Sequence, residues 1–348
     1  MADVSFDALL LLSFGGPERP EDVVPFLENV TRGKNIPRER LVEVGEHYFG
    51  FGGRSPINDA NRALIADVEA DLAARGIALP VYWGNRNWNP FVRETLERMV
   101  ADGHRDIAVF VTSAYDSYSG CRQYREDLAE AARGLDVRLY RLRHYFNHPA
   151  FVGSFAAALD RALAAAPAET RLVFVTHSIP EAMNTASGGP GAGAYVRQHE
   201  EVARLLTEAA GHADSDLAYC SRSGPPHVSW LEPDVNDHLE KLHGDGVTSV
   251  AVVPIGFVSD HMEVVYDLDT EAAATAQRLG MRFVRVDTPG TSPAFAAMVN
   301  DLVIERAAAE RGQNPERPVV GRLPAAPDRC AQDCCLNPAA VIPREALA

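Results

Sequence analysis

The sequence lacks the features of membrane-spanning, secreted and nucleic-acid-binding proteins. Its longest early apolar run, residues 8–12, is too short for a signal-peptide core or a membrane span, and no basic region precedes it. Only 33 Lys and Arg residues stand against 48 Asp and Glu residues, and the formal charge of -15 opposes binding to phosphate backbones. We therefore expect a cytoplasmic protein with no transmembrane segment and no nucleic-acid partner.

Cysteine is scarce, and nucleotide-binding motifs are missing. Five cysteines without a secretion signal argue against a disulfide framework. The chain contains neither a Rossmann phosphate fingerprint nor a Walker A motif, which disfavours a nucleotide enzyme. Three of the cysteines nevertheless fall within six residues near the end of the chain, at Cys330, Cys334 and Cys335.

The remaining composition is that of an ordinary soluble globular protein, with 46% hydrophobic and 23% charged residues. Apolar runs typical of buried parallel strands alternate with helical segments rich in Ala, Leu, Glu and Arg. These runs lie at 8–13, 80–84, 107–114, 137–141, 171–177, 216–222, 249–257 and 281–286. The pattern predicts an α/β fold of two Rossmann-like lobes, each with a four-stranded parallel sheet flanked by helices.

The boundary between the lobes is predicted near residue 150. Residues 148–166 have the spacing of a helix that bridges the lobes. This places an N-terminal lobe at 1–150 and a C-terminal lobe at 151–312, whose last helix, at 293–311, is expected to pack back across the first lobe. The Pro-rich and Cys-rich remainder, 313–348, is predicted to be an extension and not a domain.

An irregular insertion is predicted at 29–57, where aromatic residues alternate with glycines in YFGFGG. Arg32, Lys34 and Arg54 supply cations nearby. Such a lip suits a planar, apolar ligand with acidic edges, and a purely structural loop is an equally open interpretation.

Two of the apolar runs end in polar clusters, RLVFVTHSIPEAMN at 171–184 and SVAVVPIGFVSDHMEVVYDLDTE at 249–271. Ligands of parallel sheets bind just beyond the carboxyl ends of the strands. His177 and Glu263 are therefore the first candidates for chemistry. A neutral histidine is both a metal ligand and a base near neutral pH, although a lone histidine at a strand end is also a common polar cap.

Glu263, Asp267 and Glu271 are spaced four residues apart, so on a helix their carboxylates would line one face. Like charges at this spacing destabilise a helix by roughly 0.2–0.5 kcal/mol per pair. Such a row can hold a divalent cation or relay protons; a solvated helix face is the alternative.

The residues around these candidates resemble those of the ferrochelatase family. The resemblance runs from about residue 7 to residue 312 in the family's order. It rests on LLLLSFGGPE at 9–18, TRGKN at 31–35, GGRSPIN at 52–58, THSIP at 176–180, SRSGPP at 221–226, WLEPDV at 230–235 and PIGFVSDHMEVVYDLD at 254–269.

The resemblance implies a chelatase-like fold that clamps a porphyrin in a cleft and inserts ferrous iron, a lyase reaction of haem biosynthesis. His177 and Glu263 would face each other across the cleft, one binding the metal and the other accepting the pyrrole protons; which does which stays open. Asp267 and Glu271 would relay protons, His261 would orient Glu263 or its helix, and Asp260 would be structural.

The family's porphyrin-gripping positions can be matched residue by residue. They correspond here to Phe14, Arg32, Ser55, Ile57, Tyr118 and Trp230. Ser55 and Tyr118 would lie near the acidic side chains of the substrate. Several relatives have a metal-contacting tyrosine where this chain has Phe14, which cannot coordinate iron.

Some ferrochelatases, including those of actinobacteria and animals, carry a 2Fe-2S cluster held by one mid-chain cysteine and three near the C-terminus. Here Cys121, Cys330, Cys334 and Cys335 match those positions and supply the four thiolates that a cluster requires. Adjacent cysteine ligands are sterically awkward, so free thiols or a zinc site stay open. The remaining Cys220 is expected to be a buried free thiol.

The composition and cysteine pattern resemble actinobacterial relatives, which use coproporphyrin III and make coprohaem. Protoporphyrin IX is the alternative substrate. Two further alternatives are a cobalt or nickel chelatase acting on another tetrapyrrole and a porphyrin or haem carrier without chemistry. A downstream enzyme of the haem pathway is the expected protein partner.

Overall fold

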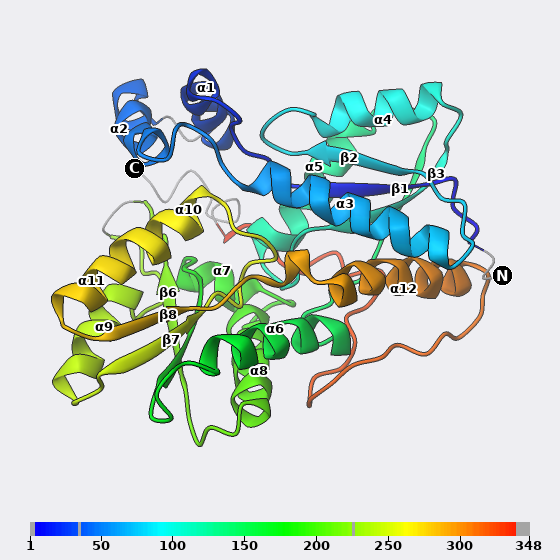
Figure 1. Ribbon diagram of the computed structural model, residues 1–348. Helices are drawn as coiled ribbons and strands as arrows, with labels where there is room; N and C mark the ends of the chain where they lie inside the picture. Colours follow the sequence, from blue (N-terminus) through cyan, green and yellow to red (C-terminus); the bar gives the residue numbers. More distant parts are fainter. Residues whose placement is uncertain (1–3, 34–35, 225–226, 339–348) are drawn as a thin grey trace.

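Two parallel sheets of four strands form the frame of the protein (Figure 1). The computed structural model describes residues 4–33, 36–224 and 227–338. The first sheet, in the order β2-β1-β3-β4, contains β1 (Ala8–Ser13), β2 (Val81–Asn85), β3 (Asp106–Val111) and β4 (Arg138–Arg141). The second, in the order β6-β5-β7-β8, contains β5 (Arg171–His177), β6 (Asp216–Cys220), β7 (Ser249–Val253) and β8 (Arg282–Arg285). The predicted two-lobed α/β fold is confirmed.

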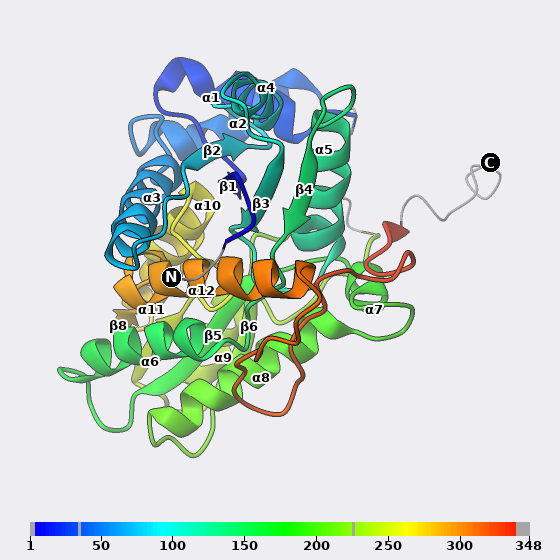
Figure 2. The ribbon, with the colours of Figure 1, turned by 90° about the vertical axis from the view of Figure 1, so that its right-hand side faces the viewer.

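Helices connect the strands and cover the sheets (Figure 2). The first lobe contains α1 (Pro20–Val30), α2 (Arg38–Phe49), α3 (Ile57–Ala74), α4 (Val92–Ala101), the π-helical turn η1 (Tyr118–Arg122) and α5 (Gln123–Ala131). The second contains α6 (Pro149–Leu163), α7 (Glu181–Ala186), α8 (Ala194–Ala209), α9 (Val235–Gly244), α10 (Met262–Val264), the π-helix η2 (Val265–Ala272), α11 (Ala273–Arg278) and the 3-10 turn η3 (Pro289–Thr291). The last helix is α12 (Pro293–Glu310).

Strand β1 shows why these runs are apolar on both sides. Leu9 and Leu11 pack into the core that contains α12, whereas Leu10 and Leu12 pack into the core that contains α4 and α5. Successive side chains of a strand point to opposite faces, so a sheet covered on both faces needs an unbroken apolar run. The unbroken apolar run therefore predicts this strand from the sequence.

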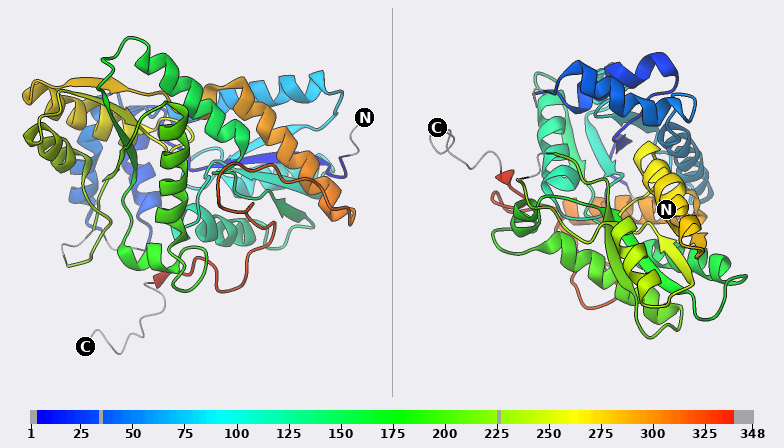
Figure 3. Two further views of the ribbon diagram at one scale, coloured as in Figure 1. Left: turned by 90° about the horizontal axis from the view of Figure 1, so that it is seen from below. Right: turned by 90° about the vertical axis from the view of Figure 1, so that its left-hand side faces the viewer.

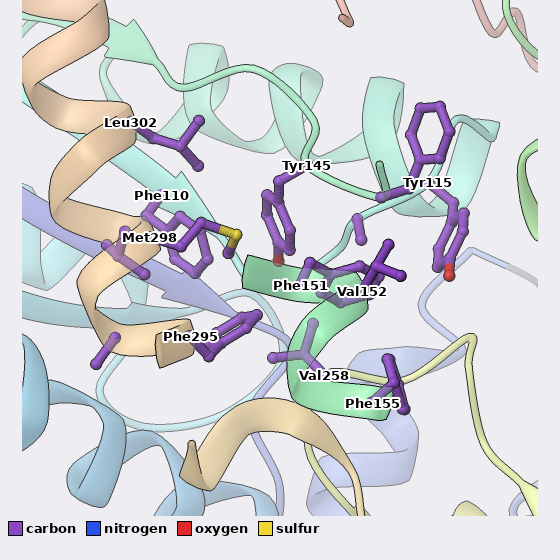
Figure 4. Close-up of a cluster of buried hydrophobic side chains, with 14 of the residues drawn as sticks. Phe110, Tyr115, Tyr145, Phe151, Val152, Phe155, Val258, Phe295, Met298 and Leu302 are labelled. Carbon is purple, nitrogen blue, oxygen red and sulfur yellow. The ribbon is translucent and has the colours of Figure 1, made fainter. Parts of the chain in front are cut away.

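One hydrophobic core is shared by the two lobes. It contains Phe110 of β3, Phe174 of β5, and Phe151 and Phe295 from the two long helices α6 and α12. In Figure 4 the aromatic rings of this core gather between α6, α12 and the first sheet. Helix α12 also packs on α3, and the Asn300 side-chain amide donates to the Val68 carbonyl oxygen at 3.0 Å. The prediction that the last helix returns to the first lobe is confirmed.

The lip is more regular than its sequence indicates. Residues 38–49, predicted to be irregular, form the 12-residue helix α2, which packs against α1. Its Leu41 and Tyr48 are buried with Phe26 of α1 and Met262 of α10. The prediction of an irregular insertion is wrong here, because an amphipathic face shared with α1 stabilises a helix despite the neighbouring glycines. Lys34 lies outside the described residues.

Residues 311–338 form a tail that runs beside α8 and α12 (Figure 3). The Val320 amide donates to the Asn147 carbonyl oxygen at 2.9 Å, and Arg143 forms a buried ion pair with Glu305 at 2.8 Å. The part of the tail beyond residue 338 lies outside the described residues. Within the described chain, no helix combines the length and the apolarity that crossing a bilayer requires.

Candidate active site

A cleft of about 710 Å³ opens where the carboxyl ends of both sheets meet the lip. Its walls come from residues following β1 and β3 in the first lobe and β5 and β7 in the second, together with α1, α2 and the start of α3. A volume in the range of about 300–1,000 Å³ is usual for small-molecule sites. The cleft is therefore large enough for a substrate of considerable size.

His177 is the last residue of β5, and its imidazole points into this cleft. Its Nδ1–H donates to the carbonyl oxygen of Ser178. Since a carbonyl can only accept, the neutral ring carries its proton on Nδ1 and a lone pair on Nε2. Nε2 is thus free to bind a metal ion or accept a proton.

Glu263 approaches His177 from the segment that follows β7. Its Oε2 lies 3.9 Å from His177 Nε2, and the two side chains are 52% and 33% exposed. Pro254 ends β7, and Gly256 allows the chain to pass close to β5, because a Cβ there would lie 2.0 Å from Thr176 Oγ1. The loop geometry thus brings Glu263 to the histidine.

Asp267 and Glu271 follow Glu263 on η2, a π-helix and not the α-helix that the spacing alone would suggest. Asp267 accepts a hydrogen bond from the Ser221 hydroxyl. Burial, aided by the neighbouring Glu263 and Glu271 charges and opposed by the Ser221 hydrogen bond, raises the pKa of Asp267 to about 6. Asp267 is therefore poised to take up and release protons near neutral pH.

A buried network holds the main chain of His177. The Tyr195 hydroxyl donates to the His177 carbonyl oxygen at 2.8 Å and lies 2.8 Å from Thr176 Oγ1. His199 Nε2 lies 2.9 Å from the same Thr176 oxygen, and its Nδ1–H donates to the Tyr195 carbonyl oxygen. Burial lowers the pKa of His199 to about 3, so this ring is neutral and accepts from Thr176.

Most of the predicted porphyrin contacts line the cleft. Those that do are Phe14, Arg32, Ser55, Ile57 and Trp230. Tyr118 is not among the lining residues; its hydroxyl donates to Glu126 Oε2 at 3.1 Å. His261 also lines the cleft, whereas Asp260 pairs with Arg285 at 2.7 Å, as expected for a structural carboxylate.

Sequence reasoning missed several polar residues of the cleft. Arg86 lies over the Tyr124 ring, with 4.4 Å from its Cζ to the centroid, and its guanidinium pairs with Asp127. Asn61, Asn87 and Arg86 all line the cleft. The polar cluster NRNWNP that follows β2 could have revealed two of them, since the same signal led to His177.

The four predicted cluster cysteines come together at one centre. Cys334 Sγ lies 3.5 Å from Cys335 Sγ, and the thiols of Cys121 and Cys335 lie within 4.8 Å of each other. Cys330 packs against this group. Cys335 has a left-handed φ of 57°, a backbone conformation that is uncommon for a residue other than glycine.

The surroundings of this centre suit thiolates. The Arg141 guanidinium donates to Cys121 Sγ at 3.1 Å, and the Gly188 amide donates to Cys335 Sγ at 3.3 Å. Hydrogen bonds from Cys330 and Cys335 hold the pKa of the Cys121 thiol below its usual range, and the same contacts raise the pKa of Cys330 and Cys335. The thiolate is the form of cysteine that binds metals. Cys220 is a buried free thiol on β6, as predicted.

Comparison with known proteins identifies the family. The family model described as Ferrochelatase matches residues 6–307. The chain belongs to the ferrochelatase family. A coproporphyrin III ferrochelatase of Streptomyces coelicolor is 56% identical over 350 residues, covering 95% of this chain and 93% of that protein. One from Nocardia farcinica is 55% identical over 311 residues (87% and 88%), and a ferrochelatase of Rhodopirellula baltica is 46% identical over 338 residues (95% and 93%).

Solved structures of other chelatases share the fold. SirB from Bacillus subtilis with Fe3+ matches with a TM-score of 0.54 at 15% identity, covering 88% of this chain and 97% of that one. The terminal siroheme enzyme CbiX matches with a TM-score of 0.50 at 14% identity, covering 85% and 97%. At this identity the likeness supports a chelatase-like architecture for this ferrochelatase, and no more.

Proposed function

We propose that the protein inserts Fe(II) into coproporphyrin III, releases the two pyrrole protons and forms coprohaem. The observation that carries the proposal is the His177–Glu263 pair, separated by 3.9 Å in a cleft of about 710 Å³. The names of the relatives that are 55–56% identical supply the substrate. Metal insertion needs a ligand for the ion and an acceptor for protons, and this pair provides both.

We assign the proton-accepting role to Glu263. Asp267 and Glu271 continue from it along η2, and neither lines the cleft, so the row leads away from the porphyrin. A carboxylate with a pKa of about 6, as in Asp267, can receive a proton from Glu263 and release it at neutral pH. His177 Nε2, with its lone pair, is then left to bind the entering iron.

Residues in the walls of the cleft position the porphyrin. Phe14 contributes an apolar surface, edge-to-face with Phe26 at 6.2 Å between ring centroids. Ser55, Arg32 and Trp230 offer hydroxyl, guanidinium and indole donors to the acidic groups of coproporphyrin III. The four-propionate substrate makes better use of these donors than protoporphyrin IX with its two propionates.

We further propose that Cys121, Cys330, Cys334 and Cys335 hold a 2Fe-2S cluster. Their convergence and the Arg141 and Gly188 donors support this assignment. When bound, such a cluster can exchange one electron. The cysteine centre ties the tail to the first lobe, because the Arg122 guanidinium donates to the Gln332 carbonyl oxygen at 2.6 Å.

The decisive experiment is anaerobic incubation of the protein with Fe(II) and either coproporphyrin III or protoporphyrin IX, followed by the porphyrin absorption bands. Faster metallation of coproporphyrin III is expected. Glu263→Gln and His177→Ala should each lower kcat by about 100-fold or more, the usual effect of removing an acid–base group. His243→Ala, on the exposed end of α9, is the matched control. Tight porphyrin binding by the unmodified protein without metallation would instead identify a carrier.

A further inference from the structure

Three N–H donors in the cleft have no acceptor among the residues that the structure describes. They are Asn61 Nδ2, Asn87 Nδ2 and Trp230 Nε1, and all three atoms are buried. Asn61 lies on the first turns of α3. It is the most deeply buried of the three, because the residue is only 1% exposed. Its carbonyl oxygen Oδ1 is also unpaired. A buried, unpaired amide lowers the stability of a fold, so the fold itself does not explain Asn61.

The neighbouring Asn58 differs at its Nδ2, although its Oδ1, like that of Asn61, has no partner among the described residues. It lies three residues earlier on α3 and is equally buried. Its Nδ2, however, donates to the Gly16 carbonyl oxygen at 2.9 Å and to Glu18 Oε1 at 3.0 Å, and it does not line the cleft. Asn58 therefore serves the fold, whereas Asn61 is buried in the wall of the cleft.

The chemistry of the substrate identifies what Asn61 meets. A porphyrin carries polar groups in only two places, the pyrrole nitrogens at its centre and the carboxylates at its edge. The centre must lie at His177 and Glu263, both supplied by the second lobe. Asn61 belongs to the wall of the first lobe, on the same helix as Ile57. It lies six residues after Ser55, which is expected near the acidic side chains of the substrate, so we take an edge carboxylate as its partner.

The charged groups of the cleft leave a need for such donors. The Arg86 guanidinium, with a side chain only 6% exposed, is paired with Asp127, so among these two arginines only Arg32 is left to bind a propionate. Coproporphyrin III brings four propionates, and hydrogen bonds to a carboxylate are stronger than those between neutral groups. Neutral amide donors without other acceptors can supply these bonds.

We propose that Asn61 is a specificity-determining residue whose side-chain amide donates to a propionate of coproporphyrin III. The inference rests on the proposed function. It deepens that function by assigning part of the preference for coproporphyrin III to one residue. Asn87 and Trp230 complete a set of neutral donors around the porphyrin edge.

The test compares Asn61→Leu with the unmodified protein in two measurements. Leucine has a similar shape but no polar atoms, so the substrate-free variant should unfold at a temperature equal to or higher than that of the unmodified protein. Its Kd for coproporphyrin III, measured by fluorescence titration, should rise by about 10- to 100-fold, the effect of losing a hydrogen bond to a charged group. The ratio of coproporphyrin III to protoporphyrin IX affinity should fall.

Two further variants keep the result interpretable. Asn58→Leu, the matched control, should lower the unfolding temperature and leave the affinity ratio unchanged. Asn61→Asp places a carboxylate against the propionate, so its coproporphyrin III affinity should fall more than that of Asn61→Leu and recover partly at high salt. An affinity ratio unchanged in both Asn61 variants, or a destabilised Asn61→Leu protein, would overturn the inference.

The outcome is separable from that of the proposed function. If the unmodified protein metallates coproporphyrin III while the Asn61 variants bind it normally, only the assignment of Asn61 fails. If the unmodified protein binds coproporphyrin III without metallating it and the affinity ratio still depends on Asn61, the recognition role stands and the chelatase role fails.

Discussion

His177 is held in position by Ser178 and by residues of the buried network around Tyr195. Ser178 fixes the tautomer of the imidazole, and the Tyr195 hydroxyl fixes the main chain at 2.8 Å from the His177 carbonyl oxygen. Thr176 Oγ1, which donates to the neutral His199, lies 2.8 Å from that hydroxyl. A metal ligand that is held in advance loses little freedom when the ion arrives, which lowers the barrier to insertion.

We expect Tyr195→Phe to lower kcat about tenfold or more, because misplacing a reacting group by a fraction of an ångström slows chemistry strongly. The KM for the porphyrin should change less than twofold, roughly, since the hydroxyl is bonded to the His177 carbonyl oxygen and the ring is kept. Steady-state metallation kinetics measure both constants.

The matched control for this variant is Tyr145→Phe. Tyr145 is also buried, and its hydroxyl donates to the Val111 carbonyl oxygen at 3.0 Å, away from the cleft. Both variants lose one buried hydrogen bond and should lose similar stability, about 1 kcal/mol. Equal kcat values for the two variants would show that Tyr195 is only structural.

Asp267 makes stability depend on pH. Its pKa is about 6 in the folded protein, against an ordinary value of 3.8, so between these pH values the folded state binds a proton that the unfolded state does not. Its contribution to folding is therefore most favourable below pH 4 and is lost as the pH rises through 6. We expect Asp267→Asn to raise the free energy of unfolding at pH 8 by about 1–3 kcal/mol.

The same variant should give a smaller gain at lower pH. Denaturant unfolding at pH 8 and pH 5 measures the difference, and Asp136→Asn, with a side chain that is 99% exposed, controls for the removal of a negative charge. An Asp267→Asn protein that gains as much at pH 5 as at pH 8 would contradict the assignment of a raised pKa.

At the scale of secondary-structure elements, the lip and the π-helix η2 are joined by one aromatic pair. The His47 and Tyr266 rings stack with centroids 3.9 Å apart and planes 5° apart. Helix α2 carries the histidine, and η2 carries the tyrosine three residues after Glu263. Opening the lip away from η2 must break this contact.

We expect Tyr266→Ala to increase the dissociation rate of the porphyrin about 2- to 10-fold, as for the loss of an aromatic pair worth about 0.5–1.5 kcal/mol. Stopped-flow fluorescence measures this rate. Tyr82→Ala is the control, because Tyr82 packs on His104 with ring centroids 5.5 Å apart in the first lobe, away from the lip. A dissociation rate that is unchanged by Tyr266→Ala would show that the stacked pair does not limit release.

Strands are predictable from this sequence, but their ends are not. Residues 107–114 and 249–257 are mostly apolar, yet β3 ends at Val111 and β7 at Val253. Beyond those points the chain stays apolar because it packs between the lobes or lines the cleft, as Ile255 and Phe257 do. Apolarity reports burial, and burial continues after the strand has ended.

The candidate site shows the same division. His177 and Glu263 are predictable because they belong to polar clusters at the ends of apolar runs. Tyr195 and Asn61 lie within amphipathic helices among other polar residues. From the sequence such positions resemble ordinary helix surface. Their roles emerge only when the helices α8 and α3 pack beside β5 and the cleft.

At the scale of the whole molecule, the cysteine centre joins parts of the chain that are far apart. Cys121 comes from the first lobe, Cys335 from the tail, and the Gly188 amide that donates to it from the second lobe. Ser187 precedes Gly188 in the chain. The Tyr195 amide donates to the Ser187 hydroxyl oxygen at 2.8 Å. The division into lobes at residue 150, the cytoplasmic location and the downstream enzyme stay predictions.

We expect Cys335→Ser to remove the visible absorption of the bound cluster and to increase cleavage of the tail in limited proteolysis, because the ligand set is no longer complete. Cys220→Ser, which alters the buried free thiol of β6, should keep both the absorption and the resistance to cleavage. Colourless protein that contains zinc would contradict the cluster assignment and support the zinc alternative.

The position of α12 sets the order in which the newly made protein can mature. Its Phe295, Met298 and Leu302 complete the core around Phe110 of the first lobe. At about 5–20 residues per second, a ribosome needs roughly 10–30 s to proceed from the end of β4 to the end of α12. Throughout that interval Phe110 lacks its partners on α12. We therefore expect nascent chains stopped before residue 293 to be bound by chaperones, and release to follow once α12 has emerged.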